Sequence, residues 1–529
     1  MADAAPPRRP LADLLDRWGA EGRLIGEHHP GGAHLTGVRD DSRQVERGNL
    51  FVAIRGLRVD GHDFATQAAK KGAAAVAVEH PVGNLRIPQL VVDRGAAALA
   101  SAAAWWYGDP SRELLTVGVT GTNGKTTTSF LAAAGLAGVG FATGLIGTVG
   151  IRVGGQMTRN EEPNTTPGAL DLQRILREMR DAGETAVVIE TSSHGLAADR
   201  VASVDYDAAI FTNLSHEHLD FHGTFDAYRW AKVSLFERLP QHGKTGRPGI
   251  GVINVDDAHA NAFIDATRGA QALPITYGTR PEADLRLTNL VAKASGSRLD
   301  YLAGGAARRI NLRLPGRFNA HNALAVLGLA EGLGLDLDAV STALEAVRGV
   351  PGRMERVDVG QPFMVVIDYA HTPGALDAVL RELAPLVAKG RGVISVFGAS
   401  GERDVGKRPL MGAAAAQWSR LIIVTEDDSR GEDPASIYEA IAAGAEQTGK
   451  RRGENLLIIP DRRAAIAEAF RQARPGGVVL LAGKGHETWN MGPVGPEPWS
   501  EREVAEQLLA EAGSRGTVGT AARPPARRE

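Results

Sequence analysis

The sequence contains no cysteine, which excludes a disulfide framework, a thiolate metal site and a cysteine nucleophile. It also lacks a strong excess of charge of either sign, because 59 lysine and arginine residues stand against 62 aspartate and glutamate residues and the formal net charge is −3. This balance gives no electrostatic reason to expect nucleic acid or an acidic membrane surface as the main partner.

Long apolar runs are lacking as well. No uninterrupted apolar run reaches the length that crosses a membrane. The first residues, MADAAPPRRP, include basic residues with no apolar core behind them, so we expect no signal peptide and no membrane insertion. These exclusions predict a soluble cytoplasmic protein.

The length of 529 residues and the hydrophobic content of 43% allow several folded domains. We predict an α/β protein with a small N-terminal α/β domain over residues 1–112 and a central domain over residues 113–348. A Rossmann-like α/β domain is expected over residues 349–513, and a disordered tail over 514–529. In the central part, short β-branched runs alternate with helical segments, which is typical of a doubly wound, mainly parallel sheet.

The stretch from Leu114 to Phe130, LLTVGVTGTNGKTTTSF, carries the strongest functional signal. An apolar run of strand length leads into a glycine turn, and Lys125 then begins a helix. Such a turn directs backbone N–H groups and the positive end of a helix dipole at one point, and glycine lets a phosphate approach closely. Lys125 can reach the outer phosphates, and the Thr126 hydroxyl can hold Mg²⁺.

We therefore predict a nucleoside triphosphate site rather than an ordinary βα turn. The widespread form GxxxxGK[ST] would need glycine at Val119, so this is the short variant GTNGKTT. The predicted nucleotide-binding loop consists of Gly121, Thr122, Asn123, Gly124, Lys125, Thr126 and Thr127.

Two further strand ends carry candidate metal ligands. Glu190 ends a predicted buried strand, and the carboxyl ends of parallel strands are where ligand groups gather. A carboxylate there can hold Mg²⁺, with a helix-capping acid as the alternative. A second strand end is followed by His216, Glu217, His218, Asp220 and His222. The zinc motif HExxH is not present in this cluster, and we predict His218 alone as a ligand.

A set of motifs occurs in one order along the chain. They are DSR at 41–43, DGHDF at 60–64, GTNGKTT at 121–127, NTTP at 164–167, ETSSHGL at 190–196, HLDFHG at 218–223, NAHNALA at 319–325, DYAHTP at 368–373 and GKGHE at 483–487. This ordered set resembles the Mur ligases over residues 35–510, and within that family it is most similar to the branch that adds the third residue of the peptidoglycan peptide.

The resemblance implies a reaction with ATP and Mg²⁺. The side-chain carboxyl of D-glutamate in UDP-N-acetylmuramoyl-L-alanyl-D-glutamate would attack the γ-phosphate of ATP, and a diamino acid would attack the resulting acyl phosphate. A carboxylate cannot be aminated directly, because hydroxide is too poor a leaving group. Catalysis would then consist mostly of positioning and charge neutralisation. A cytoplasmic monomer acting in peptidoglycan synthesis is implied.

The resemblance also implies roles for single residues. The catalytic set would be Lys125, Glu190, His218 and Lys232, and Mg²⁺ would be held by Thr126, Glu190, His218 and Lys232. Lys232 matches the family lysine that carries a carbamate, N6-carboxylysine, although a lone lysine on a helix of apolar period is ordinarily a surface residue.

Further matches concern the substrates. The implied ATP contacts outside the loop are Asn319, Asn322, Arg353, Asp368 and His371. The implied contacts of the UDP-linked dipeptide are Ser42, Thr165, Thr166, Ser193 and Arg200. Without the ordered motifs, helix caps would explain the asparagines and a surface charge would explain Arg353. The glutamine that the family often has two places before Arg200 is Ala198 here.

The implied amino-acid contacts are Asp427, Asp428, Arg430, Gly483 and Glu487. Enzymes that add meso-diaminopimelate usually read DNPR where this chain reads Asp427-Asp428-Ser429-Arg430. A guanidinium at Arg430 suits the distal carboxylate of diaminopimelate, whereas a carboxylate at Asp428 would repel it and would favour the bare ammonium of lysine or ornithine. The residues favour meso-diaminopimelate, with L-lysine or L-ornithine as the alternative.

Three other functions are alternatives to a Mur ligase. A folylpolyglutamate synthetase shares the short loop but lacks a first domain with DSR and DGHDF. A P-loop regulatory NTPase of the GTPase kind would need an NKxD motif, which this sequence does not contain. A catalytically silent scaffold is disfavoured because the phosphate, metal and acceptor positions are all filled.

Overall fold

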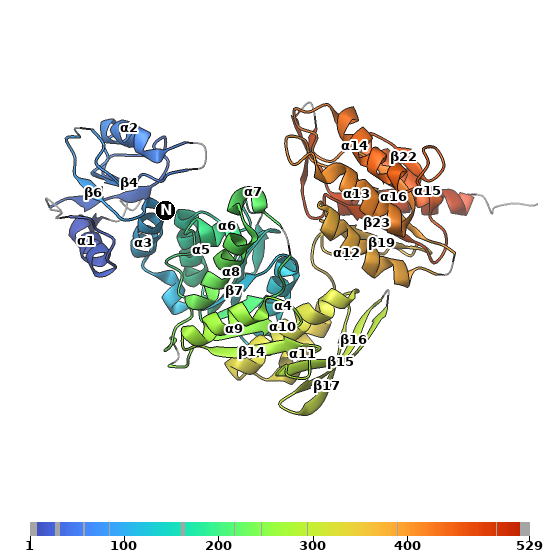
Figure 1. The fold of residues 1–529 in the computed structure, drawn as a ribbon, viewed down its shortest axis with the longest axis horizontal. Coiled ribbons are helices and arrows are strands. Elements are labelled where there is room, and N and C mark those ends of the chain that lie inside the picture. Colours follow the sequence, from blue (N-terminus) through green and yellow to red (C-terminus); the bar gives the residue numbers. More distant parts are fainter. Residues whose placement is uncertain are drawn as a thin grey trace, which may run out of the picture. The chain divides into compact units, whose positions relative to one another are not determined.

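The computed structural model describes residues 8–26, 32–56, 59–83, 85–158, 160, 164–215, 217–244, 246–293, 295–388, 390–492 and 495–518 (Figure 1). The chain divides into two compact units. The first comprises Met1–Leu287, Tyr301–Ala307 and His321–Leu344, and the second comprises Thr288–Asp300, Arg308–Ala320 and Glu345–Glu529. In the described part of the chain, no helix combines the length and the hydropathy that crossing a membrane requires.

The N-terminal part is a small parallel sheet with helices, as predicted. Its strands follow the order β3-β4-β5-β6, and every neighbouring pair is parallel. The helix α1 buries Leu11, Leu14, Leu15 and Trp18, which recur with the spacing of one helix face. The elements are β1 (Arg9–Pro10), α1 (Leu11–Ala20), β2 (His34–Leu35), β3 (Gly37–Arg39), β4 (Asn49–Val52), α2 (Ala65–Lys70), β5 (Ala75–Val78), β6 (Gln89–Val91) and α3 (Gly95–Tyr107).

The central sheet has the strand order β10-β9-β8-β11-β7-β12-β13-β14-β15-β16-β17. Its strands are β7 (Leu115–Thr120), β8 (Thr143–Ile146), β9 (Ile151–Val153), β10 (Gln156–Thr158), β11 (Ala186–Glu190), β12 (Ala208–Phe211), β13 (Ile250–Asn254), β14 (Leu273–Gly278), β15 (Leu285–Lys293), β16 (Gly296–Ala303) and β17 (Ala306–Leu312). Its helices are α4 (Lys125–Gly138), α5 (Ala169–Asp181), α6 (Ser193–Ala197), α7 (Leu219–His222), α8 (Phe225–Glu237), α9 (Ala260–Gly269), α10 (Arg317–Leu333) and α11 (Leu337–Ala346).

The predicted mainly parallel arrangement is confirmed from β8 to β15, where every neighbouring pair is parallel. The strands β9 and β10 extend this sheet in antiparallel fashion beside β8. The strands β11, β12 and β13 are buried throughout, which explains why they read as continuous apolar runs rather than alternating ones. The strand β7 lies between β11 and β12, so the loop that follows it emerges at the centre of the sheet.

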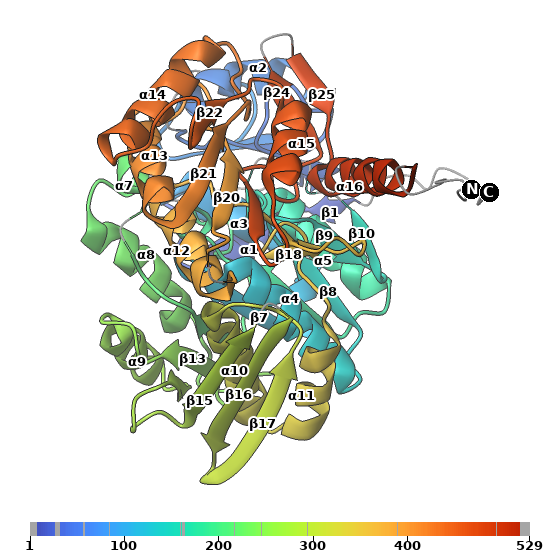
Figure 2. The same cartoon turned by 90° about the vertical axis from the view of Figure 1, so that its right-hand side faces the viewer.

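The C-terminal sheet has the order β18-β19-β23-β20-β21-β22 and is parallel except for the pair β18 and β19. Figure 2 shows β20, β21 and β22 beside one another in this sheet. Its elements are β18 (Glu355–Val357), β19 (Met364–Asp368), α12 (Pro373–Leu383), β20 (Val393–Phe397), α13 (Lys407–Trp418), β21 (Ser419–Val424), α14 (Pro434–Gln447), β22 (Leu456–Ile458), α15 (Arg462–Gln472), β23 (Val478–Ala482), β24 (Trp489–Gly492), β25 (Gly495–Pro498) and α16 (Glu501–Val518).

This sheet has a hydrophobic core on each face. Val366 and Leu480 belong to the core that includes residues of α12, α13 and α14. Their chain neighbours Ile367 and Leu481 belong to the core that includes residues of α15 and α16. The alternation along each strand therefore buries both faces, as expected of a Rossmann-like domain with helices on either side.

The predicted tail begins too early. Helix α16 runs to Val518, so residues 514–518 are helical, and residues 519–529 lie outside the described residues. The buried residues Ala505, Leu508 and Leu509 anchor α16 on the sheet.

We expect Gly251→Ala to destabilise the central sheet. A Cβ at Gly251 in β13 would lie 2.4 Å from Thr267 Oγ1 and 3.1 Å from a ring carbon of Phe236. Thr267 is β-branched and its hydroxyl donates to Phe263 O at 2.7 Å, so it cannot turn away cheaply. Overpacking of this kind lowers the free energy of unfolding by about 1–3 kcal/mol. Thermal unfolding measures the effect as a lower melting temperature.

The matched control is Gly269→Ala at the end of α9, where a Cβ would meet nothing within 4 Å. This substitution should leave the melting temperature unchanged or raise it slightly, because alanine favours the helix. Equal destabilisation by both substitutions would contradict the packing argument.

Candidate active site

The glycine turn between β7 and α4 is closely packed. Gly121 has φ 146° and Gly124 has φ 85°, which are conformations that other residues rarely adopt. A Cβ at Gly121 would lie 2.0 Å from Thr212 Oγ1, and one at Gly124 would lie 2.6 Å from Asn322 Oδ1. Both glycines are therefore required by the backbone and by their surroundings.

The loop is tied to the end of the neighbouring strand β12. The Thr122 amide donates to Asn213 O at 2.8 Å, and the Asn123 amide donates to Asn213 Oδ1 at 3.0 Å. The Thr122 hydroxyl also lies 2.9 Å from the Tyr228 hydroxyl on α8. These bonds fix the conformation of the loop, which suits a rigid cradle for phosphates.

The first turn of α4 carries the predicted phosphate and metal groups. Lys125 Nζ donates to Gly121 O at 3.0 Å and to Thr122 O at 2.8 Å, so its ammonium lies over the loop. Thr126 is buried, and its hydroxyl donates to Glu190 Oε2 at 3.1 Å. Thr127 is buried in the same turn.

Glu190, at the end of β11, is the centre of a hydrogen-bond network. Its Oε1 accepts from the Thr148 amide at 3.1 Å, and its Oε2 lies 3.1 Å from the hydroxyls of Thr126 and Thr148. Ser192 supplies the cap of helix α6 by accepting from Gly195 N. Glu190 is therefore not a helix cap, and its buried carboxylate stands beside the phosphate loop.

The predicted dipeptide contacts adjoin this carboxylate. Thr165 Oγ1 lies 3.1 Å from Thr148 Oγ1, and Thr166 Oγ1 donates to the main-chain oxygen of Glu190 at 2.8 Å. Arg200 donates to Thr166 O at 2.9 Å, and Ser193 is buried at the start of α6. The structure thus joins the NTTP segment and the phosphate loop through Glu190. In the N-terminal sheet domain, Ser42 is buried and donates to Gln67 Oε1 at 3.1 Å.

Lys232 is not the surface residue that its sequence context suggests. Its side chain on α8 is 1% exposed, and Nζ donates to Gly121 O at 2.7 Å, 4.7 Å from the centre of the Tyr228 ring. Burial and the nearby Lys125 charge hold the pKa of Lys232 well below its ordinary value, against the opposing effect of Glu217. The lowered pKa favours the neutral form of this amine more than in an exposed lysine.

His218 lies just before α7, in the left-handed region at φ 56°. Its side chain is 44% exposed, lies 3.8 Å from Glu217, and packs edge-on against the His194 ring at 4.7 Å between centres. Its ring centre is 6.2 Å from that of Tyr228, the residue that contacts Thr122. His216, from the same cluster, lies outside the described residues.

The two predicted adenine-side asparagines differ in their surroundings. Asn322 is buried against the loop, with its Oδ1 accepting from Thr128 Oγ1 at 3.2 Å. Asn319 is buried and donates to Pro315 O at 2.7 Å, inside the second compact unit. The C-cap explanation fails for both, because each lies in the first turns of α10.

The carboxyl ends of the C-terminal strands carry the remaining predicted residues. Asp368 at the end of β19 is buried and accepts from Met354 N at 2.8 Å and Ala370 N at 2.9 Å. Burial raises the pKa of Asp368, and Arg353 and these two amides oppose the rise. The Arg353 guanidinium lies 4.9 Å from the centre of the Tyr369 ring, and His371 Nδ1 lies 2.8 Å from Tyr369 O.

The predicted amino-acid contacts converge after β21 and β23. Oxygen atoms of Asp427, Asp428 and Glu487 lie within 4.8 Å of one another. A Cβ at Gly483 would lie 2.0 Å from Asp427 Oδ2, so the two loops touch where glycine has no side chain. Burial raises the pKa of Asp427 to about 6, although nearby cations lower it.

Lys484 lies among these carboxylates, and its importance was not recognised in the sequence. It is fully buried, and its Nζ lies 2.8 Å from Asp428 Oδ1 and 2.7 Å from Glu487 Oε2. Burial alone would lower the pKa of Lys484, but the surrounding carboxylates raise it. The motif GKGHE contains this lysine, yet the sequence does not reveal which acids it meets.

Asp428 is therefore not the bare carboxylate assumed from the sequence. Besides Lys484, its Oδ1 accepts from Met491 N at 2.8 Å on β24. Asp428 and Arg430 both lie in the left-handed region, and Arg430 N donates to Met491 O at 2.8 Å. The expected repulsion of a substrate carboxylate by Asp428 is consequently reduced by an internal counter-charge.

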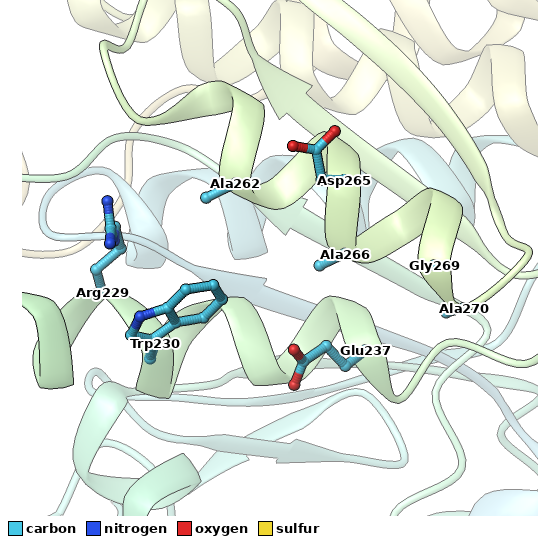
Figure 3. A pocket seen from close by; sticks show the side chains of 8 residues that line it. All are labelled: Arg229, Trp230, Glu237, Ala262, Asp265, Ala266, Gly269 and Ala270. Atoms are coloured by element: carbon cyan, nitrogen blue, oxygen red, sulfur yellow. The ribbon is translucent and has the colours of Figure 1, made fainter.

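A surface hollow between α8 and α9 lies apart from these groups. Figure 3 shows its lining, with Arg229, Trp230 and Glu237 on α8 and Asp265 on α9. None of the residues that line it belongs to the predicted site. On the same helix α8, Trp230 is 52% exposed while Lys232 is buried.

Comparison with known proteins shows the family of the chain. Three family models match the chain: "Mur ligase family, catalytic domain" over residues 34–107, "Mur ligase middle domain" over 119–330, and "Mur ligase, glutamate ligase domain" over 352–485. The chain belongs to the Mur ligase family. It is an ATP-dependent ligase of the class that forms carbon–nitrogen bonds, and this family serves peptidoglycan synthesis.

Individual relatives extend over nearly the whole chain. A UDP-N-acetylmuramyl-tripeptide synthetase from Roseiflexus sp. is 46% identical over 495 residues, which are 92% of this chain and 97% of the relative. A UDP-N-acetylmuramoyl-L-alanyl-D-glutamate--2,6-diaminopimelate ligase from Geobacillus kaustophilus is 40% identical over 488 residues, 92% of this chain and 97% of the relative. A solved structure of an enzyme with this second name has a TM-score of 0.66 and 32% identity, covering 92% of this chain and 97% of its own.

We expect Gly124→Ala to raise the KM for ATP by about tenfold or more. The added Cβ would meet Asn322 Oδ1 at 2.6 Å, and the positive φ of Gly124 disfavours alanine, so the loop would shift where phosphates bind. Initial-rate kinetics at varied ATP concentration give the measurement.

Gly140→Ala is the control, because Gly140 has φ 97° but nothing lies within 4 Å of its Cβ position. It carries the same kind of backbone strain beyond the other end of α4 and should leave the KM for ATP unchanged. A similar rise in both variants would mean that general strain, not loop geometry, is responsible.

Proposed function

We propose that this protein adds a diamino acid, meso-2,6-diaminopimelate, to the D-glutamate of UDP-N-acetylmuramoyl-L-alanyl-D-glutamate in the cytoplasm. The observation that carries the proposal is the network around Glu190. It contacts Thr126 of the phosphate loop through its carboxylate and Thr166 of the NTTP segment through its main-chain oxygen. In this proposal residues 1–112 hold the UDP part, 113–348 hold ATP and 349–513 hold the amine.

The proposed reaction has two steps. The D-glutamate carboxylate, held by Thr165, Thr166, Ser193 and Arg200, attacks the γ-phosphorus, and ADP leaves. The amine then attacks the acyl carbon, inorganic phosphate leaves, and the amine loses its proton. Lys125 and the loop amides neutralise the charge that develops on the phosphate oxygens.

The donor set fits Mg²⁺, which prefers oxygen ligands. Thr126 and Glu190 offer a hydroxyl and a carboxylate 3.1 Å apart, and we assign His218 and Lys232 as the further ligands. When bound, Mg²⁺ supplies positive charge to the phosphate oxygens. Asn319, Asn322, Arg353, Asp368 and His371 are assigned to the nucleotide.

Lys232 is proposed to carry a carbamate. A neutral amine attacks CO₂ and loses one proton, and the product is an anion with two oxygens. The buried position and lowered pKa of Lys232 favour the neutral form that this step requires. The carbamate would place oxygen ligands beside Gly121, where Nζ now lies 2.7 Å from the main-chain oxygen.

We expect a carbamate ¹³C resonance when the protein is equilibrated with ¹³C-bicarbonate. The variant Lys232→Gln should lose this resonance, and its turnover should fall by about 10–100-fold. Lys244→Arg is the control, because Lys244 Nζ lies 2.6 Å from Asp207 and also donates to Leu114 O and Asp205 O, away from Gly121. A resonance that persists in Lys232→Gln would assign the modification elsewhere.

The choice of amine depends on the charges around Asp428. Lys484 offsets the negative charge of Asp428, so this residue opposes the distal carboxylate of diaminopimelate less than its sequence position suggests. Arg430 is held at the same loop, and its Nε has no hydrogen-bond partner among the described residues. Both observations support meso-diaminopimelate over L-lysine or L-ornithine.

Phosphate release should be measured with ATP, Mg²⁺, the UDP-linked dipeptide and each of the three amines. We expect meso-diaminopimelate to have the highest kcat/KM, and Arg430→Met to lower it by about tenfold or more while the KM for ATP stays constant. A kcat/KM for L-lysine or L-ornithine about tenfold higher than that for meso-diaminopimelate would overturn the choice of amine. Amine-independent GTP hydrolysis would instead favour a regulatory NTPase.

A further inference from the structure

A buried ion pair adjoins the two loops that follow β21 and β23 in the second compact unit, the loops proposed to bind the diamino acid. Arg462 is the first residue of α15 and Glu501 the first residue of α16, and they are 3% and 1% exposed. Their side chains make a two-pronged contact, with Nε 3.0 Å from Oε2 and a terminal nitrogen 2.7 Å from Oε1. Trp499 Nε1 also donates to Glu501 Oε2 at 2.7 Å. Because burying two charges is costly, a pair in this place calls for an explanation.

The remaining N–H groups of Arg462 contact two strand ends. One terminal nitrogen donates to Glu426 O at 3.1 Å, and the other donates to Ala482 O at 2.8 Å. Glu426 lies two residues beyond the end of β21, and Ala482 is the last residue of β23. The residues that follow directly are Asp427 and Gly483.

The sheet itself does not join these two points. Strand β20 lies between β21 and β23, so no ladder hydrogen bond can connect Glu426 to Ala482. The guanidinium therefore bridges two loops across an intervening strand. The loops also touch directly at Gly483, whose Cβ position is 2.0 Å from Asp427 Oδ2.

We propose that Arg462, oriented by Glu501, is a positioning residue that sets the spacing of the Asp427 and Gly483 loops and thereby the affinity for the amine. The inference rests on the proposed function, in which these loops bind the diamino acid. Arg462 is not expected to touch the amine, because its described N–H contacts are all to the protein.

The pair also influences the charge of Asp427. The pKa of Asp427 is raised to about 6, mainly by burial. Arg462 and Lys484 oppose this rise, whereas Glu487 and Asp428 add to it. Lys407 and Tyr369 lie near the same carboxyl. Loss of Arg462 should raise the pKa of Asp427 further, so the acid limb of kcat/KM for the amine should move to higher pH.

The variants are Arg462→Met, Arg462→Lys and Glu501→Gln, each in the full chain. Arg463→Met is the matched control, because Arg463 is the next residue of α15 and also reaches α16, through Gln507 at 3.0 Å and Glu511 at 2.9 Å, but is 41% exposed. Arg462→Lys keeps the charge and loses the planar fork, so it tests the geometry if Arg462→Met fails to fold.

We expect Arg462→Met and Glu501→Gln to raise the KM for meso-diaminopimelate by about tenfold or more. Formation of the acyl phosphate needs ATP and the UDP-linked dipeptide but no amine. The amount of acyl phosphate that can be trapped should therefore stay within about twofold of the amount from the unchanged protein. Arg463→Met should change neither quantity. An unchanged amine KM in a folded Arg462→Met or Arg462→Lys variant overturns the inference.

Amide hydrogen exchange separates this inference from the proposed function. Residues 426–430 and 483–487 should exchange faster in the Arg462 variants than in Arg463→Met, whatever reaction the protein catalyses. Unchanged exchange in those segments overturns the positioning role. Faster exchange in a protein that forms no amide with any of the amines would support the positioning role while removing the proposed reaction.

Discussion

The contact between Thr126 and Glu190 is the constraint on which the first compact unit depends. It joins the helix after the phosphate loop to the end of the adjacent strand β11, at a hydrogen-bond distance of 3.1 Å. Glu190 also contacts Thr148 through its carboxylate and Thr166 through its main-chain oxygen, so this one residue holds three segments together. A buried carboxylate that accepts several hydrogen bonds has little freedom, so the loop after β7 and the segments of Thr148 and Thr166 are held rigidly together.

The second unit achieves the same rigidity with ion pairs. Lys484 holds Asp428 and Glu487, Arg462 holds the strand ends beneath them, and Arg408 makes a bidentate pair with Glu432. Arg408 is buried, so its charge is used inside the protein. The two units thus rely on different supporting contacts, hydroxyl and amide hydrogen bonds to one carboxylate in the first and ion pairs in the second.

The sequence predicted the fold class and the family because the relevant signals are local. A glycine turn after a buried strand, and the order of short motifs along the chain, need no knowledge of contacts between distant residues. The burial of Lys232 could not be read in this way, because its helix gives no sign that Nζ reaches Gly121 O. The pairing of Asp428 with Lys484 was missed for the same reason, since 56 residues separate them. The individual roles of the site residues stay predictions.

The pairing of Asp428 with Lys484 has a consequence for how the sequence of this loop can be interpreted. The two side chains form one electrostatic unit, because Nζ and Oδ1 are 2.8 Å apart in a buried setting. Replacing the acid by a neutral residue leaves a buried ammonium without one of its counter-ions, and replacing the lysine leaves neighbouring carboxylates to repel one another. The charge of this region is therefore a property of residues 428, 484 and 487 together, and the four-residue loop 427–430 alone does not describe it.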